Sequence, residues 1–360
     1  MIVAYVSGHG YGHATRVAEV LRALREGAPE VGLAVVTAAP EKLFRDTVPG
    51  PFDFRLRECD VGLAQKGPLV IDEDATARRW HALAAGRAER AAEEGRWLRS
   101  IGARVVLGDI PPLAFEAAAE ADTPAVGLAN FSWDWIYRHL ARRQPALGAA
   151  ADAAAAAYAG AALLLQLPFA GDLSAFPRRE PIPLVARRPR IDRAEARTRL
   201  GLPQSGDCVL VSFGGIGMPA FDRSALASLP DFRFLIDTDA GERPGNVTVV
   251  DAARRTALGL GYQDLVGAAD AVVTKPGYGI VTDAIAAGTR IVYTERGDFP
   301  EYPILVAEMQ RYIPCAHVGN EDLLAGRWRA ALDQVLARPV PPPPDLSGAA
   351  VAARRLLDFA

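Results

Sequence analysis

The sequence predicts an α/β protein of two doubly wound, Rossmann-like domains that face a central cleft. Short apolar runs of strand length alternate with segments of helical periodicity, a pattern typical of parallel sheets covered by helices on both faces. The alternation occurs twice along the chain, and a glycine-rich loop follows the first strand of each series. The 360 residues, half of them apolar, are enough for two hydrophobic cores. Because open α/β sheets bind ligands at the carboxyl ends of their strands, we expect both loops at one cleft.

The first series defines a predicted N-terminal domain of residues 1–170. Its apolar runs indicate strands at residues 2–6, 32–37, 52–58, 105–108, 125–128 and 162–167. Helical patterns fall between them, at residues 14–26, 74–100 and 113–121 and from about residue 133. The apolar stretch 153–169 is mostly alanine and is interrupted by Gly160, so it indicates a helix followed by a buried strand and not a membrane span.

A proline- and arginine-rich segment, residues 171–203, is the predicted linker to a C-terminal domain of residues 204–340. Strands are expected in that domain at residues 208–213, 232–237, 247–250, 271–274 and 290–293, and a helix at 279–287. The last helix, within residues 346–360, is expected to pack back on the N-terminal domain.

Composition argues against several partners. A net charge of −3 and a pI near 6.0 leave no basic stripe for nucleic acid. Cys59, Cys208 and Cys315 lie far apart and lack metal-ligand spacing, which indicates a reducing, cytoplasmic compartment. We therefore expect a cytoplasmic protein without a transmembrane segment, of unspecified oligomeric state.

The first glycine-rich loop, "GHGYGHATR" (Gly8–Arg16), fails the dinucleotide fingerprint. His13 stands where the third glycine of that fingerprint should be, and the nearest acid after the second strand is Glu41. A P-loop is also absent, because Lys275 precedes its glycines instead of following them. These departures argue against both an NAD(P) enzyme and a P-loop kinase.

Two loops of the second series are suited to binding phosphate. One is "SFGGIGMP" after a strand, and the other is "VVTKPGYGIVTDAIAAG", where a strand ends, a lysine follows and a helix begins. The residues of these loops that we expect to bind a diphosphate are Gly214, Gly215, Gly217, Lys275, Gly277 and Gly279. Glycines allow backbone N–H groups to approach an anion, and a helix N-terminus adds about half a positive charge. Asp283 lies about one turn into the helix, where its carboxylate can accept both hydroxyls of a ribose. The alternative is that these glycines only shape turns.

At these motifs the chain resembles the GT-B glycosyltransferases. The segment around Lys275 resembles the donor-nucleotide signature of the bacterial transferase that adds N-acetylglucosamine to the peptidoglycan lipid intermediate. The segments "GHGYGHATR", "NFSWDWIY" and "KPGYG" are more closely similar to the glycosyltransferase-like N-terminal domain of L-arabinokinases. The resemblance implies a GT-B fold, a nucleotide diphosphosugar donor, UDP-linked by this analogy, and transfer with inversion.

The resemblance also implies roles for particular residues. His13 would face the donor phosphates and the acceptor, and Glu301 would read hydroxyls of the donor sugar. Asp283 would be the ribose-binding acid, one methylene shorter than the usual glutamate, and a base-binding loop would lie near residues 260–265. Further residues of the donor diphosphate site would be Gly10, Gly12 and Tyr278.

Glycosyl transfer requires a base that activates the acceptor hydroxyl, and histidine suits this role near neutral pH. His13 is the first candidate and His9 the second, while Asp109, at the end of a strand, could orient a histidine or bind the acceptor. The alternatives are that His13 caps a helix or binds phosphate without transferring protons, and that Asp109 is a helix cap. A candidate sugar or acceptor pocket comprises Asn130, Ser132, Trp133 and Asp134.

We expect no metal and no cofactor besides the donor. His9 and His13 span a turn with no further ligand nearby, and "DTD" (Asp237–Asp239) is interpreted as capping at a strand end. The leading hypothesis is an inverting, metal-independent glycosyltransferase acting on a small-molecule or glycan acceptor. The alternatives are a non-catalytic nucleotide-sugar-binding module and a nucleotide-sugar epimerase or hydrolase.

Overall fold

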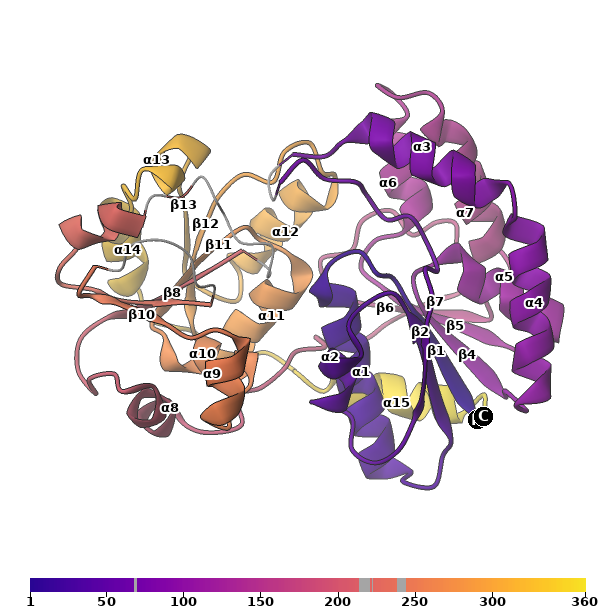
Figure 1. Cartoon of the computed structure of the whole chain (residues 1–360), viewed down its shortest axis with the longest axis horizontal. Coiled ribbons are helices and arrows are strands. Elements are labelled where there is room, and N and C mark those ends of the chain that lie inside the picture. Colours follow the sequence, from indigo (N-terminus) through magenta and orange to yellow (C-terminus); the bar gives the residue numbers. More distant parts are fainter. Residues whose placement is uncertain (68–69, 214–220, 222, 238–243) are drawn as a thin grey trace.

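The computed structural model describes residues 1–67, 70–213, 221, 223–237 and 244–360. It contains two parallel sheets, each covered by helices, which lie side by side (Figure 1). The strand orders are β3-β2-β1-β4-β5-β6-β7 and β10-β9-β8-β11-β12-β13. In both sheets the order reverses direction at the first strand of the series, as a doubly wound sheet requires. The predicted fold class is therefore confirmed.

The first sheet extends beyond the boundary predicted at residue 170. Its strands are β1 (Ile2–Val6), β2 (Leu33–Thr37), β3 (Asp53–Leu56), β4 (Val105–Asp109), β5 (Ala125–Ala129), β6 (Leu163–Gln166) and β7 (Arg179–Pro181). The short strand β7 pairs with β6 and lies inside the segment predicted as linker. Its three residues are polar or proline, so no apolar run indicates a strand there.

Two of the helices predicted in the first half differ in the structure, and α2 was not predicted. The helices are α1 (Tyr11–Gly27), α2 (Glu41–Arg45), α3 (Glu73–Ala84), α4 (Arg87–Ser100), α5 (Pro112–Ala121), α6 (Trp133–Leu140) and α7 (Leu147–Tyr158). The helix expected over 74–100 is two helices that break at Ala85 and Gly86, where glycine disfavours a continuous helix. Helix α1 begins at Tyr11 instead of residue 14, which places His13 within its first turn.

The second sheet carries its own helices and a further strand at its edge. Its strands are β8 (Cys208–Ser212), β9 (Arg233–Ile236), β10 (Val247–Val249), β11 (Ala271–Thr274), β12 (Arg290–Tyr293) and β13 (Cys315–His317). The helices of this half are α8 (Arg193–Leu200), the 3-10 helix η1 (Arg223–Ser228), α9 (Ala252–Ala257), α10 (Tyr262–Ala268), α11 (Tyr278–Ala287), α12 (Glu301–Met309), α13 (Asn320–Leu324) and α14 (Arg329–Leu336). Helix α8 occupies the end of the predicted linker and packs on α10.

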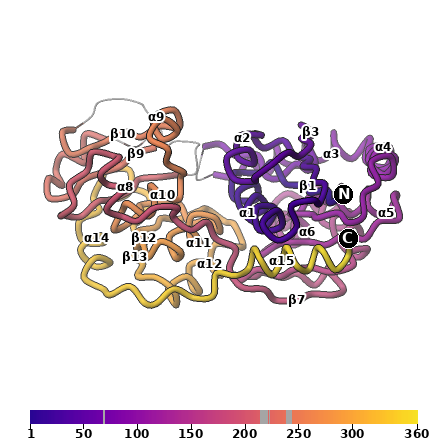
Figure 2. The backbone as a smooth tube through the Cα atoms, turned by 90° about the horizontal axis from the view of Figure 1, so that it is seen from below, coloured from indigo at the N-terminus to yellow at the C-terminus, as the bar shows by residue number. Residues whose placement is uncertain are grey.

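One apolar cluster joins the two halves. It runs from one face of the first sheet, through Leu184 and Val185 of the connecting segment, to α10 and α11 of the second half. The last helix, α15 (Gly348–Leu357), returns from the second half and packs along α1 (Figure 2). Two further clusters fill the other face of each sheet. Burial of these apolar side chains holds the carboxyl ends of β1 and β11 close together.

The helices that the structure describes are each too short or too polar to cross a membrane.

Candidate active site

The first turns of α1 and α11 meet between the two halves. Helix α1 follows β1 directly and α11 follows β11, so both start at the carboxyl end of a strand inside their sheets. A Cβ built on Gly279 would lie 3.4 Å from the Cα of Gly12. Gly10, at the cap of α1, has a φ of 74°, a left-handed conformation that favours glycine. Two positive helix ends therefore converge on one place, which favours an anion there.

His13 and Asp109 form a hydrogen-bonded pair beside this contact. His13 Nδ1 lies 2.8 Å from Asp109 Oδ1, and the carboxylate is fully buried at the end of β4. Burial alone would raise the pKa of Asp109, but the neighbouring Arg16 and His13 lower it below its ordinary value. An ionised carboxylate only accepts hydrogen bonds, so the contact with Asp109 requires the proton on Nδ1, although the donor Arg16 Nη2 also lies 3.0 Å from this nitrogen. In neutral His13 the lone pair is then on Nε2, as a general base requires.

Arg16 connects this pair to both halves of the molecule. Its Nε donates to Asp109 Oδ2 and its Nη2 to Oδ1, each at 2.5 Å, and its Nη1 donates to Asn130 Oδ1 at 2.8 Å. The guanidinium carbon also lies 5.1 Å from the centre of the Tyr278 ring, at the start of α11. Sequence reasoning did not single out Arg16. The available signal was its position three residues after His13, on the same face of one helix.

Glu301 lies within the same network. Asn130 Nδ2 donates to Glu301 Oε1 at 2.7 Å, and Arg296 Nη1 donates to Glu301 Oε2 at 2.5 Å. Asn130 and Glu301 are both buried. The Asn130 amide thus accepts from Arg16 of the first half and donates to Glu301 of the second, so two predicted site residues from different halves are joined directly.

His9 is held differently from His13. The backbone N–H of Leu63 donates to His9 Nδ1 at 3.2 Å, so this nitrogen is unprotonated. Burial, together with nearby positive charges, lowers the pKa of His9 to about 3. The His9 ring makes an edge contact with Trp133, with ring centres 5.5 Å apart. A histidine of such low basicity is a poor proton acceptor, so these contacts favour His13 over His9 as the base.

Trp133 is a fully buried support for these rings. Its Nε1 donates to Asp60 Oδ2 at 2.8 Å, while Ser7 donates to Asp60 Oδ1 at 3.1 Å. Tyr137 stacks on Trp133 with ring centres 5.6 Å apart. Burial raises the pKa of Asp60, although its hydrogen bonds act in the opposite direction. Trp133 therefore orients the loop around His9, and no motif in the sequence pointed to Asp60.

The other members of the predicted sugar pocket lie away from the network. Ser132 Oγ donates to the Asp172 carbonyl at 3.4 Å. Asp134 is buried, and its Oδ1 has no hydrogen-bond partner within the described part of the chain. Of the four residues, Asn130 alone joins the hydrogen-bonded chain from His13 to Glu301.

Positive charge gathers at the start of α11. Burial and the nearby Arg296 guanidinium lower the pKa of Lys275 to about 8. A Cβ built on Gly277 would lie 3.9 Å from Arg296 Nη1, so the arginine lies close to the cap of the helix. A bound anion would lower the repulsion between Lys275 and Arg296, although Arg296 is already paired with Glu301. The predicted phosphate ligands Gly214, Gly215 and Gly217 lie outside the described residues.

Asp283 has a protein partner in the structure. Its Oδ1 accepts from the backbone N–H of Arg187 at 3.1 Å, and its Oδ2 accepts from Arg187 Nε at 3.1 Å and from Nη2. The Arg187 guanidinium carbon also lies 5.4 Å from the ring centre of Tyr262, in the segment where a base-binding loop is expected. The ribose-binding role of Asp283 remains a prediction, and the carboxylate already holds an arginine of the connecting segment.

The "DTD" motif is described only in part. Asp237 Oδ2 accepts from Ser212 Oγ at 2.8 Å, and Asp239 lies outside the described residues. Within the described ranges, no group of three histidine, cysteine, aspartate or glutamate side chains is arranged to hold a metal ion.

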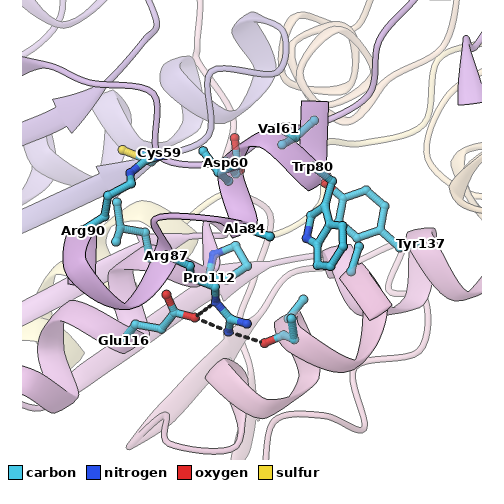
Figure 3. A pocket seen from close by; sticks show the side chains of 15 residues that line it. Cys59, Asp60, Val61, Trp80, Ala84, Arg87, Arg90, Pro112, Glu116 and Tyr137 are labelled. Atoms are coloured by element: carbon cyan, nitrogen blue, oxygen red, sulfur yellow. Dashed lines mark hydrogen bonds and ion pairs between the residues drawn. The ribbon is translucent and has the colours of Figure 1, made fainter. Parts of the chain in front are cut away.

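A pocket adjoins the site in the first half (Figure 3). Its walls are mostly apolar and are formed by the segment 59–61 and by helices α3, α4, α5, α6 and α7. Trp80 and Tyr137 lie at one side, and Arg87 is paired with Glu116 at the other. Asp60 lines the pocket and also binds Trp133, so the pocket lies behind the wall that supports His9 and His13. Its residues come from many separate segments, which explains why no motif indicated it.

Solved structures define the class of fold. A UDP-glucosyltransferase from Polygonum tinctorium superposes with a TM-score of 0.61 at 14% sequence identity, covering 99% of this chain and 92% of the other. A putative UDP-N-acetylglucosamine 2-epimerase from Listeria monocytogenes superposes with a TM-score of 0.57 at 11% identity, covering 99% and 94%. The chain has the GT-B fold of the glycosyltransferases, as its motifs predicted.

Sequence similarity points to one curated relative. L-arabinokinase from Arabidopsis thaliana is 32% identical over 344 residues, which cover 92% of this chain. The match covers 32% of the relative, so the chain spans about a third of its length. No family model matches the chain. The predicted resemblance to glycosyltransferases and to L-arabinokinase is confirmed at the level of fold and sequence similarity.

Proposed function

We propose that the chain is a glycosyltransferase that moves a sugar from a nucleotide diphosphosugar, UDP-linked, to a hydroxyl of a small molecule or glycan. The observation that carries this proposal is the buried His13–Asp109 pair beside the convergent starts of α1 and α11. The proposed base and the proposed anion site would therefore lie close together, contributed by opposite halves. Such a transfer needs both within one site.

In the proposed reaction, His13 Nε2 takes the proton of the acceptor hydroxyl. The acceptor oxygen forms a bond to the anomeric carbon of the sugar as the bond from that carbon to the diphosphate oxygen breaks. Attack from the side opposite the leaving group inverts the anomeric centre. Asp109 stabilises the imidazolium that forms, as the carboxylate of a catalytic triad does. A positioned base of this kind contributes about 10²–10⁴-fold to the rate.

The leaving nucleoside diphosphate gains negative charge during the reaction. Lys275 and the N-terminus of α11 stabilise that charge without a metal ion. Arg296 lies beside both Gly277 and Glu301, so it links the expected phosphate loop to the residue expected to read sugar hydroxyls.

The test compares His13→Ala with His81→Ala, an exposed histidine on α3 that serves as the matched control. Purified protein is incubated with UDP-sugars and a broad panel of acceptors, and release of UDP and of glycosylated product is measured. We expect His13→Ala to lose about 10²-fold or more of the rate and His81→Ala to keep it. Full activity of His13→Ala would refute the mechanism.

Two other functions have support and are distinguished by the same assay. The fold is shared with a putative UDP-N-acetylglucosamine 2-epimerase, and an epimerase would change the sugar of its donor without any acceptor. The similarity to part of L-arabinokinase supports a nucleotide-sugar-binding module, which would bind UDP without turning over any donor. Turnover that depends on an acceptor would argue against both.

A further inference from the structure

We propose that Arg187 occupies the Asp283 carboxylate by hydrogen bonding to it. The carboxylate then does not accept the ribose 2′-hydroxyl of the donor. The chain therefore binds ribose and 2′-deoxyribose nucleotides about equally well. The inference rests on the proposed function, because it assumes that a nucleoside diphosphate is bound at α11. It names the class of donor that this site admits.

The first step is the state of the Asp283 carboxylate. Three N–H groups of Arg187, from the backbone, Nε and Nη2, donate to its two oxygens. A carboxylate offers about four acceptor positions, so most of them are filled by protein donors. Asp283 is 2% exposed and the Arg187 side chain 15%, so the pair is a bidentate ion pair with a buried carboxylate. Its separation by a ligand would leave a partly buried guanidinium without its counter-charge.

The second step is the place of the Arg187 side chain. Arg187 lies in the segment between β7 and α8, and its guanidinium stands between Asp283 of α11 and the Tyr262 ring of α10. The Tyr262 hydroxyl donates to Ser212 Oγ at 2.7 Å, so the ring is itself fixed to the end of β8. Arg187 is held by its main chain, by the carboxylate and by the ring. The arginine is therefore preorganised in the space between the expected base loop and the expected ribose acid.

The third step is what this arrangement presents to a nucleoside. Arg187 Nη1 makes no hydrogen bond to any residue that the structure describes, whereas Nε and Nη2 are taken by Asp283. The site thus offers N–H donors where a free carboxylate was expected. A buried acceptor rejects a ligand that lacks the matching hydroxyl because the acceptor is then left unpaired. Asp283 already has partners, so the loss of the 2′-hydroxyl leaves no buried group unpaired.

The experiment compares UDP with 2′-deoxy-UDP, which differ only in that hydroxyl. Dissociation constants are measured by titration calorimetry for the full chain and for Asp283→Asn and Arg187→Met. We expect the wild-type constants for the two nucleotides to agree within about threefold and Asp283→Asn to leave their ratio unchanged. Arg187→Met frees the carboxylate, and we expect it to gain a preference of about tenfold for UDP.

The comparison on the wild-type chain requires no variant to fold. A preference for UDP of about tenfold or more in the wild type, lost in Asp283→Asn, would overturn the inference and leave the proposed function standing. Failure of both nucleotides to bind would instead refute the proposed function, and the inference with it. The two failures are therefore distinguishable.

Discussion

Replacement of Arg16 by methionine tests the network around the candidate base. Arg16 is 4% exposed, donates to both oxygens of Asp109 and donates to Asn130. Each hydrogen bond to a charged group contributes about 1.5–3 kcal/mol, and removal of one partner of a buried ion pair costs about 3–5 kcal/mol. We therefore expect Arg16→Met to lower the free energy of unfolding by about 3–5 kcal/mol at neutral pH.

The loss of stability caused by Arg16→Met should depend on pH and should be larger at neutral than at acidic pH. In the wild type the pKa of Asp109 is lowered, so its contribution to stability is present above the unfolded pKa of about 3.9 and is lost as the pH falls through the folded pKa. Without Arg16, burial raises the pKa of Asp109, and the ionised carboxylate destabilises the fold above that raised pKa. Protonation relieves this cost, so the difference between Arg16→Met and the wild type should be smaller at about pH 5 than at about pH 7.5.

Urea denaturation followed by tryptophan fluorescence at both pH values measures this difference. Arg45→Met on α2 is the control, because Arg45 pairs with Glu41 and the two side chains are 44% and 46% exposed. We expect a cost of at most about 1 kcal/mol for Arg45→Met. A cost below about 1 kcal/mol for Arg16→Met at neutral pH, or a cost that does not change with pH, would refute the reasoning.

Two further predictions concern ligand binding and catalysis. Because the pKa of Lys275 is lowered to about 8, this side chain loses its positive charge as the pH rises from about 7 to about 9, and we expect UDP to bind more weakly. We expect Lys275→Met to bind UDP at least about tenfold more weakly at pH 7. Its affinity should no longer depend on pH over this range. Calorimetry checks this, with exposed Lys42→Met as control; a pH-independent wild-type affinity would contradict it. We also expect His9→Asn, whose Oδ1 can still accept from the Leu63 N–H, to keep about a tenth or more of the transfer rate, whereas His13→Ala loses about 10²-fold. Equal losses in initial-rate assays would show that the two histidines act together.

Local sequence signals were sufficient for the architecture because the period of apolar residues is a property of each segment. The apolar runs of β1 and β11 were predicted at the bounds that the structure has, Ile2–Val6 and Ala271–Thr274. The prediction was wrong where local signals were weak or conflicting. β7 is three polar or proline residues, and α1 begins within glycines that usually mark a loop.

The sequence also placed His13 and Asp109 at the same edge of the first sheet and allowed Asp109 to orient a histidine. Both follow strands of one parallel series, and parallel strands bring their carboxyl ends to the same edge of the sheet. In the structure β1 and β4 are direct neighbours, and the two side chains are 2.8 Å apart. Arg16 escaped notice because an arginine on a helix is ordinarily an exposed side chain. Its burial depends on Asp109 and Asn130, which lie 93 and 114 residues further along the chain.

The sequence by itself determined the α/β fold with two parallel sheets and the glycine-rich helix starts, and it predicted His13 and Asp109 as candidates for base catalysis. The partners of Asp283 and Glu301 were decided only by the tertiary structure. Asp283 is paired with Arg187, 96 residues away, and Glu301 with Asn130, 171 residues away. Motif spacing describes which groups a segment carries, whereas the packing of distant segments decides whether a carboxylate meets a ligand or a guanidinium of its own chain. The sequence therefore predicted a ribose contact for Asp283, and only the folded chain shows that Arg187 binds the same carboxylate.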